Sequence, residues 1–448
     1  MILSDNNLRM LKSDALHLFK DAIKTVDSYN SIIEHLSLKD NNFTVSDIFG
    51  KRKFYDLSTY KNIYVVGAGK ASAKMSEAVE AILGERISTG LVVTKYGFSN
   101  NQLKRIKIDE AAHPVPDENG IRATEKIIEI CKKASKNDLL IFLLSGGASS
   151  LLTYPEANIS LNDLQNLNQL LLNSGLSIQE MNTIRKQVSK VKGGKLAEIA
   201  RPADILTLVI SDVIGDNIDI IGSAPTRPND TTADDALKIL LKYNLMKEIP
   251  SSAKDFILAK RSGKDYNINE RIIDAVEPDI FIIANNQMAL NGIKISAEKL
   301  GYDAEIVPNV LSGEARVTAK EIVETVLVKK ISGVKHCFIF GGETTITIKG
   351  GGKGGRNQEL CLAAAIHLKG MDNIVLLSCG TDGNDGPTDA AGAICDGRTI
   401  LKAEKLKLNA ADYLKKNNSY NFFSKLNDLI KMPPTQTNVM DVVIVLTI

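Results

Sequence analysis

The chain has 448 residues, of which 44% are hydrophobic and 24% charged, as is typical of a soluble protein with two or three domains. Its 55 basic and 53 acidic side chains leave a net charge of +2, so no bulk positive field favours nucleic acid. No apolar run approaches the about 18 residues that cross a membrane, and the N-terminus resembles neither a signal nor a transit peptide. The five cysteines lack C-x-x-C spacing and predict buried thiols, not disulfides or a zinc site, so we expect a cytoplasmic protein.

Apolar residues from Leu8 to Val26 recur at helical spacing and predict an amphipathic helix within the first 35 residues. Short apolar runs then alternate with helical patterns. The strands predicted in this half are 62–66, 91–94, 138–144 and 205–211. The predicted helices lie near 71–83, 120–135, 161–173, 177–190 and 233–243. Because the strands are apolar without alternation and are separated by helices, they indicate a parallel sheet with helices on both faces.

A polar, weakly periodic segment at 250–275 is a candidate domain boundary and hinge. The strands expected beyond it are 279–284, 304–307, 336–340 and 373–379. The sequence TTITIKG (344–350) alternates and predicts an antiparallel strand near a hairpin. We therefore expect an α/β protein with two domains, 1–255 and 256–448, each a mainly parallel sheet with helices on both faces. The last strand, 441–448, fits either sheet.

The segment IYVVGAGKASAKM (63–75) predicts a strand, a turn at Gly67 and Gly69, then Lys70 and a helix. A glycine turn that opens a helix directs backbone N–H groups and the positive end of the helix dipole at an anion. The functional interpretation is therefore an anion site in which Lys70 supplies a point charge. The alternative is a purely structural strand-turn-helix unit.

Two familiar nucleotide motifs do not fit this turn. A Walker A loop is excluded because Tyr64 stands where its first glycine belongs and Ala71 where its serine or threonine belongs. A dinucleotide fingerprint is disfavoured because Ser72 replaces its third glycine, and the next strand ends in Lys95 instead of an acidic residue.

Further small and charged residues follow the next two strands. Ser145, Gly146 and Gly147 come after strand 138–144, where successive small residues form a backbone nest for an anion. Close packing is one alternative, and a serine nucleophile is another that the missing G-x-S-x-G pattern disfavours. Asp212 follows strand 205–211 and would cap a helix, hold Mg²⁺ or orient a hydroxyl group. Lys192 lies ahead of it beside two glycines.

The second half holds two more glycine-rich segments. GGKGGRNQE (351–359) contains Gly351, Gly352, Gly354 and Gly355 before Arg356. A flexible basic loop of this kind can close over phosphates, with its arginine binding oxygens bidentately.

CGTDGNDGPTDAAGA (379–393) carries Asp382, Asp385 and Asp389 directly after a strand. An EF-hand is disfavoured, because its twelfth position, counted from Asp382, is Ala393. His113, which precedes a proline, is interpreted as a loop residue more readily than as a catalytic one.

Together these segments resemble the class II glycerate kinases, the family with a C-terminal MOFRL domain. The resemblance spans residues 8–448 and rests on collinear motifs: VVGAGKAS, AAHPVPDENG, LLSGGASSLL, MNTIRKQVSKVKGGKLA, VISDVIGD, GSAPT, FGGETTITIKGGGKGGRNQE, GTDGNDGPTDAAGA and PTQTNVMD. Two positions depart from the family pattern. Ala224 stands where relatives more often have glycine, and Gln436 stands where many have glycine.

The resemblance implies ATP-dependent phosphorylation of D-glycerate with Mg²⁺ or a similar divalent cation, in a cleft between two α/β domains. It implies 2-phosphoglycerate as the product, on a non-phosphorylative or branched Entner–Doudoroff route. The residues alone do not separate the 2-hydroxyl from the 3-hydroxyl, and a dehydrogenase and a sugar-phosphate sensor remain rivals. The partners expected are small-molecule substrates and a second copy in a homodimer, with no nucleic acid and no membrane.

The proposed roles follow in-line phosphoryl transfer. Lys70 and Arg356 would stabilise charge on the phosphoryl group. Asp212 and Asp382 would bind metal or orient the hydroxyl, with Asp385 as a further metal ligand. The phosphate and substrate donors expected are Gly67, Gly69, Ser145, Gly146, Gly147, Lys192, Gly351, Gly352, Gly354 and Gly355. ATP phosphates are expected on the C-terminal loops and glycerate near Lys70.

Overall fold

The structure is a computed structural model that describes residues 2–99, 102–263, 277–308 and 311–448. It divides into two units, Ser28–Ile283 and Met1–Asp27 with Ala284–Ile448, which we call the first unit and the second unit. Each unit combines a six-stranded sheet with helices, which confirms the predicted α/β class with two domains. Within the described ranges, no helix is both long and apolar enough to span a membrane.

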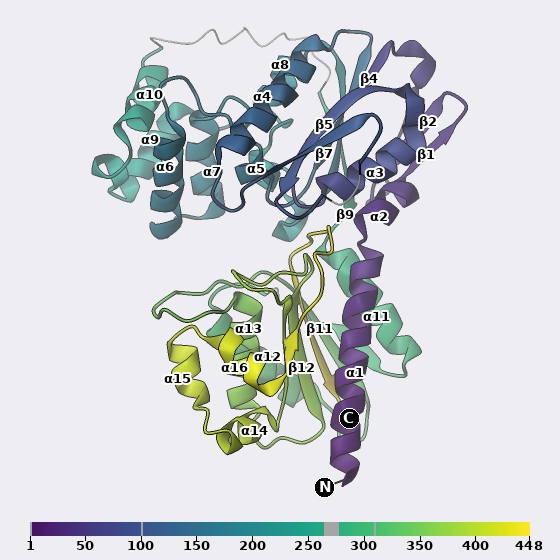
Figure 1. The fold of residues 1–448 in the computed structure, drawn as a ribbon, viewed down its shortest axis with the longest axis vertical. Coiled ribbons are helices and arrows are strands. Elements are labelled where there is room, and N and C mark those ends of the chain that lie inside the picture. Colours follow the sequence, from purple (N-terminus) through teal and green to yellow (C-terminus); the bar gives the residue numbers. More distant parts are fainter. Residues whose placement is uncertain (1, 100–101, 264–276, 309–310) are drawn as a thin grey trace. The chain divides into compact units, whose positions relative to one another are not determined.

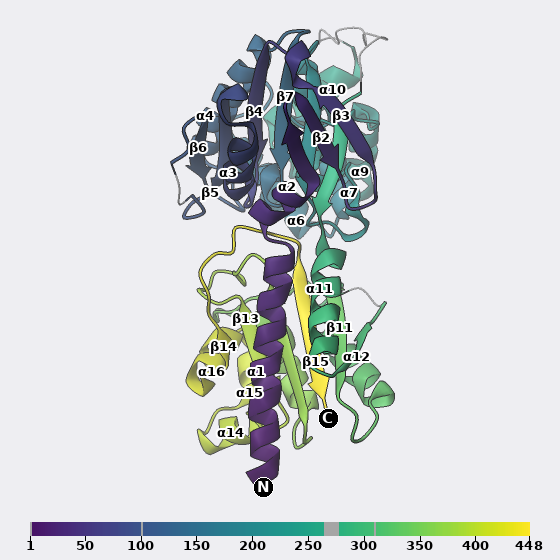
Figure 2. The ribbon, with the colours of Figure 1, turned by 90° about the vertical axis from the view of Figure 1, so that its right-hand side faces the viewer.

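The main sheet of the first unit has the strand order β6-β5-β4-β7-β8-β9 (Figures 1 and 2). Its strands are β4 (Asn62–Ala68), β5 (Ile87–Lys95), β6 (Ile106–Ala111), β7 (Asp138–Leu144), β8 (Asp204–Ile210) and β9 (Asp279–Ala284). The pairs from β6 to β8 are all parallel, which confirms the predicted parallel sheet, although β6 itself was not among the predicted strands. Every residue of β7 is buried, because a strand between parallel neighbours is covered on both faces.

Helices cover both faces of this sheet (Figure 1). The helices of the first unit are α2 (Ser28–His35), α3 (Ser72–Leu83), α4 (Glu118–Lys133), α5 (Ala148–Leu151), α6 (Leu161–Asn173), α7 (Ile178–Gln187), α8 (Lys195–Ala200), α9 (Ala233–Lys242) and α10 (Ser251–Arg261). Side chains of α4, α5 and α8 form one core with the sheet. Helices α6, α7, α9 and α10 form a separate apolar cluster of their own.

A small antiparallel sheet in the first unit was not predicted. It contains β1 (Leu36–Lys39), β2 (Asn42–Ser46) and β3 (Arg52–Asp56). Lys53 pairs with Asp279, and Ile48 N–H donates to Ile282 O at 3.0 Å, so this sheet is bonded to β9. Strand 279–284 therefore belongs to the first unit, whereas the sequence predicted it in the second domain.

The sheet of the second unit is mixed, so the prediction of a mainly parallel sheet is wrong here. Its order is β10-β11-β15-β12-β13-β14, and only β10 and β11 among these neighbours pair in parallel. The strands are β10 (Asp303–Ile306), β11 (His336–Gly342), β12 (Ile374–Gly380), β13 (Gly392–Asp396), β14 (Leu429–Ile430) and β15 (Asp441–Thr447). The final strand β15 inserts between β11 and β12 and runs against both, which the local sequence pattern cannot reveal.

Two helices lie on one face of this sheet and the others on the opposite face (Figures 1 and 2). The first face carries α1 (Ile2–Thr25) and α11 (Asn286–Lys299). The opposite face carries α12 (Ala315–Lys329), α13 (Arg356–His367), α14 (Thr399–Lys405), α15 (Ala410–Lys415) and α16 (Ser419–Leu426). One hydrophobic core of the unit lies between the sheet and this second layer.

The predicted N-terminal helix is confirmed as α1, but it belongs to the second unit. The Lys12 ammonium lies 3.0 Å from Asp396 and 2.7 Å from Asp428, and both carboxylates are largely buried. The second unit therefore includes residues 1–27, and its bounds differ from the predicted division at 255. The apolar face of α1 needs an apolar partner surface, which residues later in the chain supply.

Two local predictions also differ from the structure. Residues 344–350 form no strand, because β11 is already flanked by β10 and β15, and Ile348 is 74% exposed. Within the expected boundary at 250–275, residues 251–261 form α10, and residues 264–276 lie outside the described residues.

Candidate active site

The glycine turns after β4 and β7 are bonded to each other, because these strands are neighbours and end at the same edge of the sheet. Lys70 N–H donates to Gly146 O at 2.8 Å, and Ala71 N–H donates to Ser145 Oγ at 3.0 Å. The structure thus brings Lys70, Ser145 and Gly146 together from distant parts of the sequence. The backbone amides of Lys70 and Ala71 therefore donate to the second turn and hold it in place.

Close packing accounts for several of the small residues at this edge. A Cβ at Gly67 would overlap Leu143 O, and a Cβ at Gly69 would overlap Ser145 Oγ. Gly69 also has φ +135°, which a residue with a side chain rarely adopts. The Ser145 side chain is fully buried, and its hydroxyl oxygen accepts the hydrogen bond from the Ala71 amide. Packing, an alternative that the sequence left open, is therefore present at both turns.

Gly147 is the point at which three segments converge. It has φ +86° and precedes α5. A Cβ there would lie 3.0 Å from His113 Cδ2, 3.1 Å from His113 Nε2 and 3.4 Å from Lys70 Cγ. The His113 ring and the Lys70 stem therefore flank the same glycine. The sequence interpretation of His113 as a loop residue missed this contact, because the preceding strand β6 was not among the predicted strands.

Lys192 is buried below the second glycine turn. Its ammonium nitrogen donates to Ser149 O and Leu152 O, each at 2.8 Å, which ties down both ends of the short helix α5. Burial and, to a lesser extent, the nearby charge of Arg185 lower the pKa of Lys192 to about 7. A neutral amine has two hydrogens, which match these two acceptors. This geometry gives Lys192 a supporting position behind the turn.

Asp212 lies two residues beyond β8, half-buried, at the same edge of the first sheet as Lys70. The other predicted acidic residues, Asp382 and Asp385, belong to the second unit. Among the residues that the structure describes, no group of three or more His, Cys, Asp or Glu side chains is placed to hold a metal ion.

In the second unit, Arg356 is held by carboxylates. Its Nε and Nη2 donate to the two oxygens of Asp441 at 2.5 and 2.9 Å, and Nη1 lies 2.7 Å from Glu343 Oε1. Burial alone would lower the pKa of Arg356, but the charge and hydrogen bonds of Asp441 and the charge of Glu343 raise it above its ordinary value. Neither Asp441 nor Glu343 was predicted to have a role, although the motifs PTQTNVMD and FGGE contain them.

Asp385 accepts backbone hydrogen bonds at the N-terminus of α13. Its oxygens receive Asn357 N–H at 3.1 Å and Gln358 N–H at 2.8 Å. Burial raises the pKa of Asp385 to about 7, against the lowering effect of these bonds. Both carboxylate oxygens of Asp385 accept hydrogen bonds from α13, so Asp385 holds the N-terminus of this helix in place.

Asp382 and Asp441 face a common point beyond β12. Oδ1 of each lies 3.3 Å from the position of a Cβ on Gly380. Asp382 Oδ1 also accepts Asn384 N–H at 2.9 Å. Two carboxylates therefore converge at the end of this strand, next to the Arg356 guanidinium.

The glycine-rich loop of the second unit is anchored, which differs from the flexible loop that the sequence predicted. Gly352 N–H donates to Lys416 O at 3.0 Å, and Lys353 N–H donates to Asn418 Oδ1 at 3.1 Å. Added Cβ atoms at 352, 354 and 355 would overlap or crowd Asn418, Ser419 and Asp385, whereas one at 351 would meet nothing. These glycines permit close packing, and Gly351 is the position with open space beside it.

The two departures from the family pattern share a conformation. Ala224 has φ +55° and Gln436 has φ +56°, in the left-handed region that favours glycine. The structure therefore gives a physical reason why glycine suits both positions, and it shows that this chain adopts the same backbone with a side chain present.

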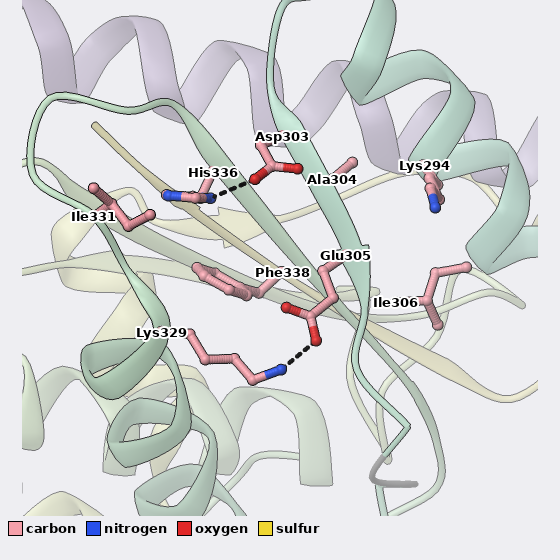
Figure 3. Close-up of a pocket in the computed structure, with 9 residues that line it drawn as sticks. All are labelled: Lys294, Asp303, Ala304, Glu305, Ile306, Lys329, Ile331, His336 and Phe338. Carbon is pink, nitrogen blue, oxygen red and sulfur yellow. Dashed lines mark hydrogen bonds and ion pairs between the residues drawn. The ribbon is translucent and has the colours of Figure 1, made fainter.

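A cavity of about 530 Å³ in the second unit lies against the edge strand β10 (Figure 3). Its charged lining residues pair with each other: Lys329 with Glu305, and His336 with Asp303 at 3.4 Å. No predicted site residue lines it. The cavity is therefore separate from the candidate active site.

Comparisons with known proteins identify the family of the chain. Residues 14–258 match a family described as a domain of unknown function (DUF4147), and residues 336–441 match the MOFRL family. The chain is 42% identical to D-glycerate 2-kinase of Thermotoga maritima over 386 residues, which are 85% of this chain and 90% of that protein. It is 38% identical to glycerate 2-kinase of Pyrococcus horikoshii over 443 residues, 97% of each chain. A crystal structure of glycerate kinase from T. maritima matches 98% of this chain and 100% of its own, with TM-score 0.80 and 39% identity.

Proposed function

The chain belongs to the MOFRL-type family of glycerate 2-kinases, and we propose that it transfers the γ-phosphoryl group of ATP to the 2-hydroxyl of D-glycerate. The product is 2-phosphoglycerate. The observation that carries this function is the 42% identity to D-glycerate 2-kinase across 85% of the chain. Transfer to the 3-hydroxyl and hydride transfer by a dehydrogenase are the activities that the proposal excludes.

The first unit binds glycerate in this proposal. Support comes from the paired glycine turns after β4 and β7, which hold Lys70 at the carboxyl edge of a parallel sheet, where such sheets bind ligands. The Lys70 ammonium neutralises the glycerate carboxylate, while Asp212 orients the hydroxyl that attacks the γ-phosphorus. The Gly146 and Gly147 amides are the further hydrogen-bond donors to glycerate, because the amides of Lys70 and Ala71 already donate to the second glycine turn.

The second unit binds the ATP phosphates. Arg356 supplies the positive charge, and Asp441 fixes its orientation through two parallel bonds. Glu343 is the more exposed partner, with 43% of its side chain accessible against 2% for Asp441. A phosphate oxygen therefore replaces Glu343 on the guanidinium, and Asp441 stays in place. In this role Arg356 is a cation that Asp441 holds in position, and it is paired with carboxylates in the structure.

Asp382 would hold the Mg²⁺ that accompanies ATP. The donor set fits, because Mg²⁺ is usually held by one or two carboxylates together with substrate phosphates and water. The ion, when bound, neutralises charge on the phosphates. Asp385 is a weaker candidate than the sequence suggested, because both of its oxygens accept amides of α13, and both oxygens of Asp441 are likewise engaged by Arg356. The interdomain cleft that the family resemblance implies stays a prediction.

A coupled ADP-release assay with D-glycerate and MgATP tests the function. We expect turnover with D-glycerate and a product whose phosphorus couples to a single proton in the NMR spectrum, as in 2-phosphoglycerate. Coupling to two protons would identify 3-phosphoglycerate and contradict the proposed regiochemistry. Oxidation of NADH with hydroxypyruvate, without ADP release from glycerate, would identify a dehydrogenase instead.

Location and assembly complete the proposal. All five cysteines are buried and unpaired, which supports the cytoplasm as the compartment. A homodimer is the proposed assembly, and light scattering at micromolar concentration tests it.

A further inference from the structure

His113 lies in an unusual place for a loop residue. It stands two residues past the end of β6, which is separated from β7 by β5 and β4 (Figure 2). Neighbouring strands are about 4.8 Å apart, so the β7 turn is about 14 Å from β6 along the sheet. The loop must therefore cross the ends of β5 and β4 to bring the imidazole against Gly147.

Hydrogen bonds hold this loop at both ends. Tyr96 N–H donates to Ala111 O at 3.2 Å, where the loop begins. At its other end, Gln165 donates to Pro116 O at 2.7 Å, and Tyr96 Oη donates to Asp117 Oδ2 at 2.6 Å. The loop is thus fixed across the edge of the sheet, and the position of His113 is set before any ligand binds.

The imidazole shares its neighbour with the Lys70 side chain. His113 Nε2 and Lys70 Cγ lie 3.1 and 3.4 Å from the position that a Cβ of Gly147 would occupy. Gly147 is therefore flanked by two nitrogen-bearing side chains, from the loops after β6 and β4. The His113 ring and the Lys70 stem both lie beside the turn whose amides are the proposed anion donors. A carboxylate has two oxygens, and one donor on each side of it fits this arrangement better than one lysine alone.

We propose that His113 is a substrate-binding residue that donates a hydrogen bond to the carboxylate of D-glycerate, opposite the Lys70 ammonium. The inference rests on the proposed function, because it takes the Lys70 turn as the glycerate site. Two donors on one carboxylate fix its orientation, which a flexible lysine does not do alone. His113 thereby selects hydroxy acids over uncharged polyols and aligns the 2-hydroxyl, which lies on the carbon next to the carboxylate.

Two variants separate hydrogen bonding from packing. His113→Gln keeps an N–H donor near the Nε2 position, whereas His113→Leu keeps an apolar body of similar size without a donor. For His113→Leu, we expect the KM for D-glycerate to rise about tenfold to hundredfold, as for the loss of a hydrogen bond to a charged group. The KM for ATP should stay within about twofold, and His113→Gln should recover most of the loss. His17→Leu is the matched control, because His17 lies on α1 in the second unit with 56% of its side chain exposed.

A binding measurement without ATP gives a second readout. Calorimetric titration with D-glycerate should show the same weakening for His113→Leu, and no weakening for His17→Leu. Equal glycerate affinity in wild type, His113→Leu and His113→Gln would overturn the inference, as would a matching rise in the KM for ATP. If Lys70→Ala weakens glycerate binding but His113→Leu does not, only this inference fails. If the wild type neither binds nor phosphorylates D-glycerate, the proposed function itself fails.

Discussion

Arg356→Met should destabilise the second unit, because it leaves a buried charge behind. The Asp441 side chain is 2% exposed and binds Arg356 through two hydrogen bonds. Removing one partner of a buried ion pair costs about 3–5 kcal/mol. Arg356 is 32% exposed, so water offsets part of this cost and we expect about 2–4 kcal/mol. For a unit of this size, each kcal/mol lowers the transition by about 2–4 °C, so the expected shift is about 5–15 °C.

Differential scanning calorimetry of Arg356→Met, Asp441→Asn and the double variant measures this shift. The double variant should be more stable than the sum of the single effects predicts, because it no longer buries an unpaired carboxylate. Lys320→Met is the control, since its pair with Glu324 is exposed and should contribute less than about 1 kcal/mol. Additive effects within about 0.5 kcal/mol, or a shift below about 1 °C for Arg356→Met, would refute the reasoning.

Four further predictions concern single residues. Lys70→Ala should lower kcat/KM about a hundredfold, about 3 kcal/mol, without changing the unfolding transition, and near-normal kcat/KM would remove it from the mechanism. Asp382→Asn should raise the Mg²⁺ concentration needed for half-maximal activity, whereas an unchanged titration would leave it a role in turn geometry alone. Lys407→Gly should stabilise the second unit by about 1 kcal/mol in urea denaturation, because Lys407 is exposed at φ +58°; a lower urea midpoint would contradict this. Lys192 has a pKa of about 7 when folded and an ordinary, higher pKa when unfolded, so the unfolded chain binds more protons above pH 7. Its contribution to stability should therefore rise with pH from about 7 towards its unfolded pKa, and urea denaturation of Lys192→Met should lack that rise.

The sequence alone determined the elements whose signals are local. Strand β7 was predicted with its observed ends, because the six consecutive apolar residues after Asp138 are typical of a strand that is covered on both faces. The turn at Gly69 was recognisable because a strand, two glycines and a helix follow each other directly, although Gly67 proved to lie within β4. Collinear motifs then indicated the family, and Lys70 and Arg356 stood out as charges at glycine turns.

Only the tertiary structure decided which distant residues meet. Lys12 belongs with Asp396 and Asp428 of the second unit, and no pattern within α1 specifies those partners. The last strand entered the second sheet between β11 and β12, where its direction makes the sheet mixed. Arg356 proved to be held by Asp441, and His113 proved to lie against Gly147. Periodicity and turn chemistry are set by neighbours along the chain, whereas pairing and site geometry depend on contacts between residues far apart in sequence.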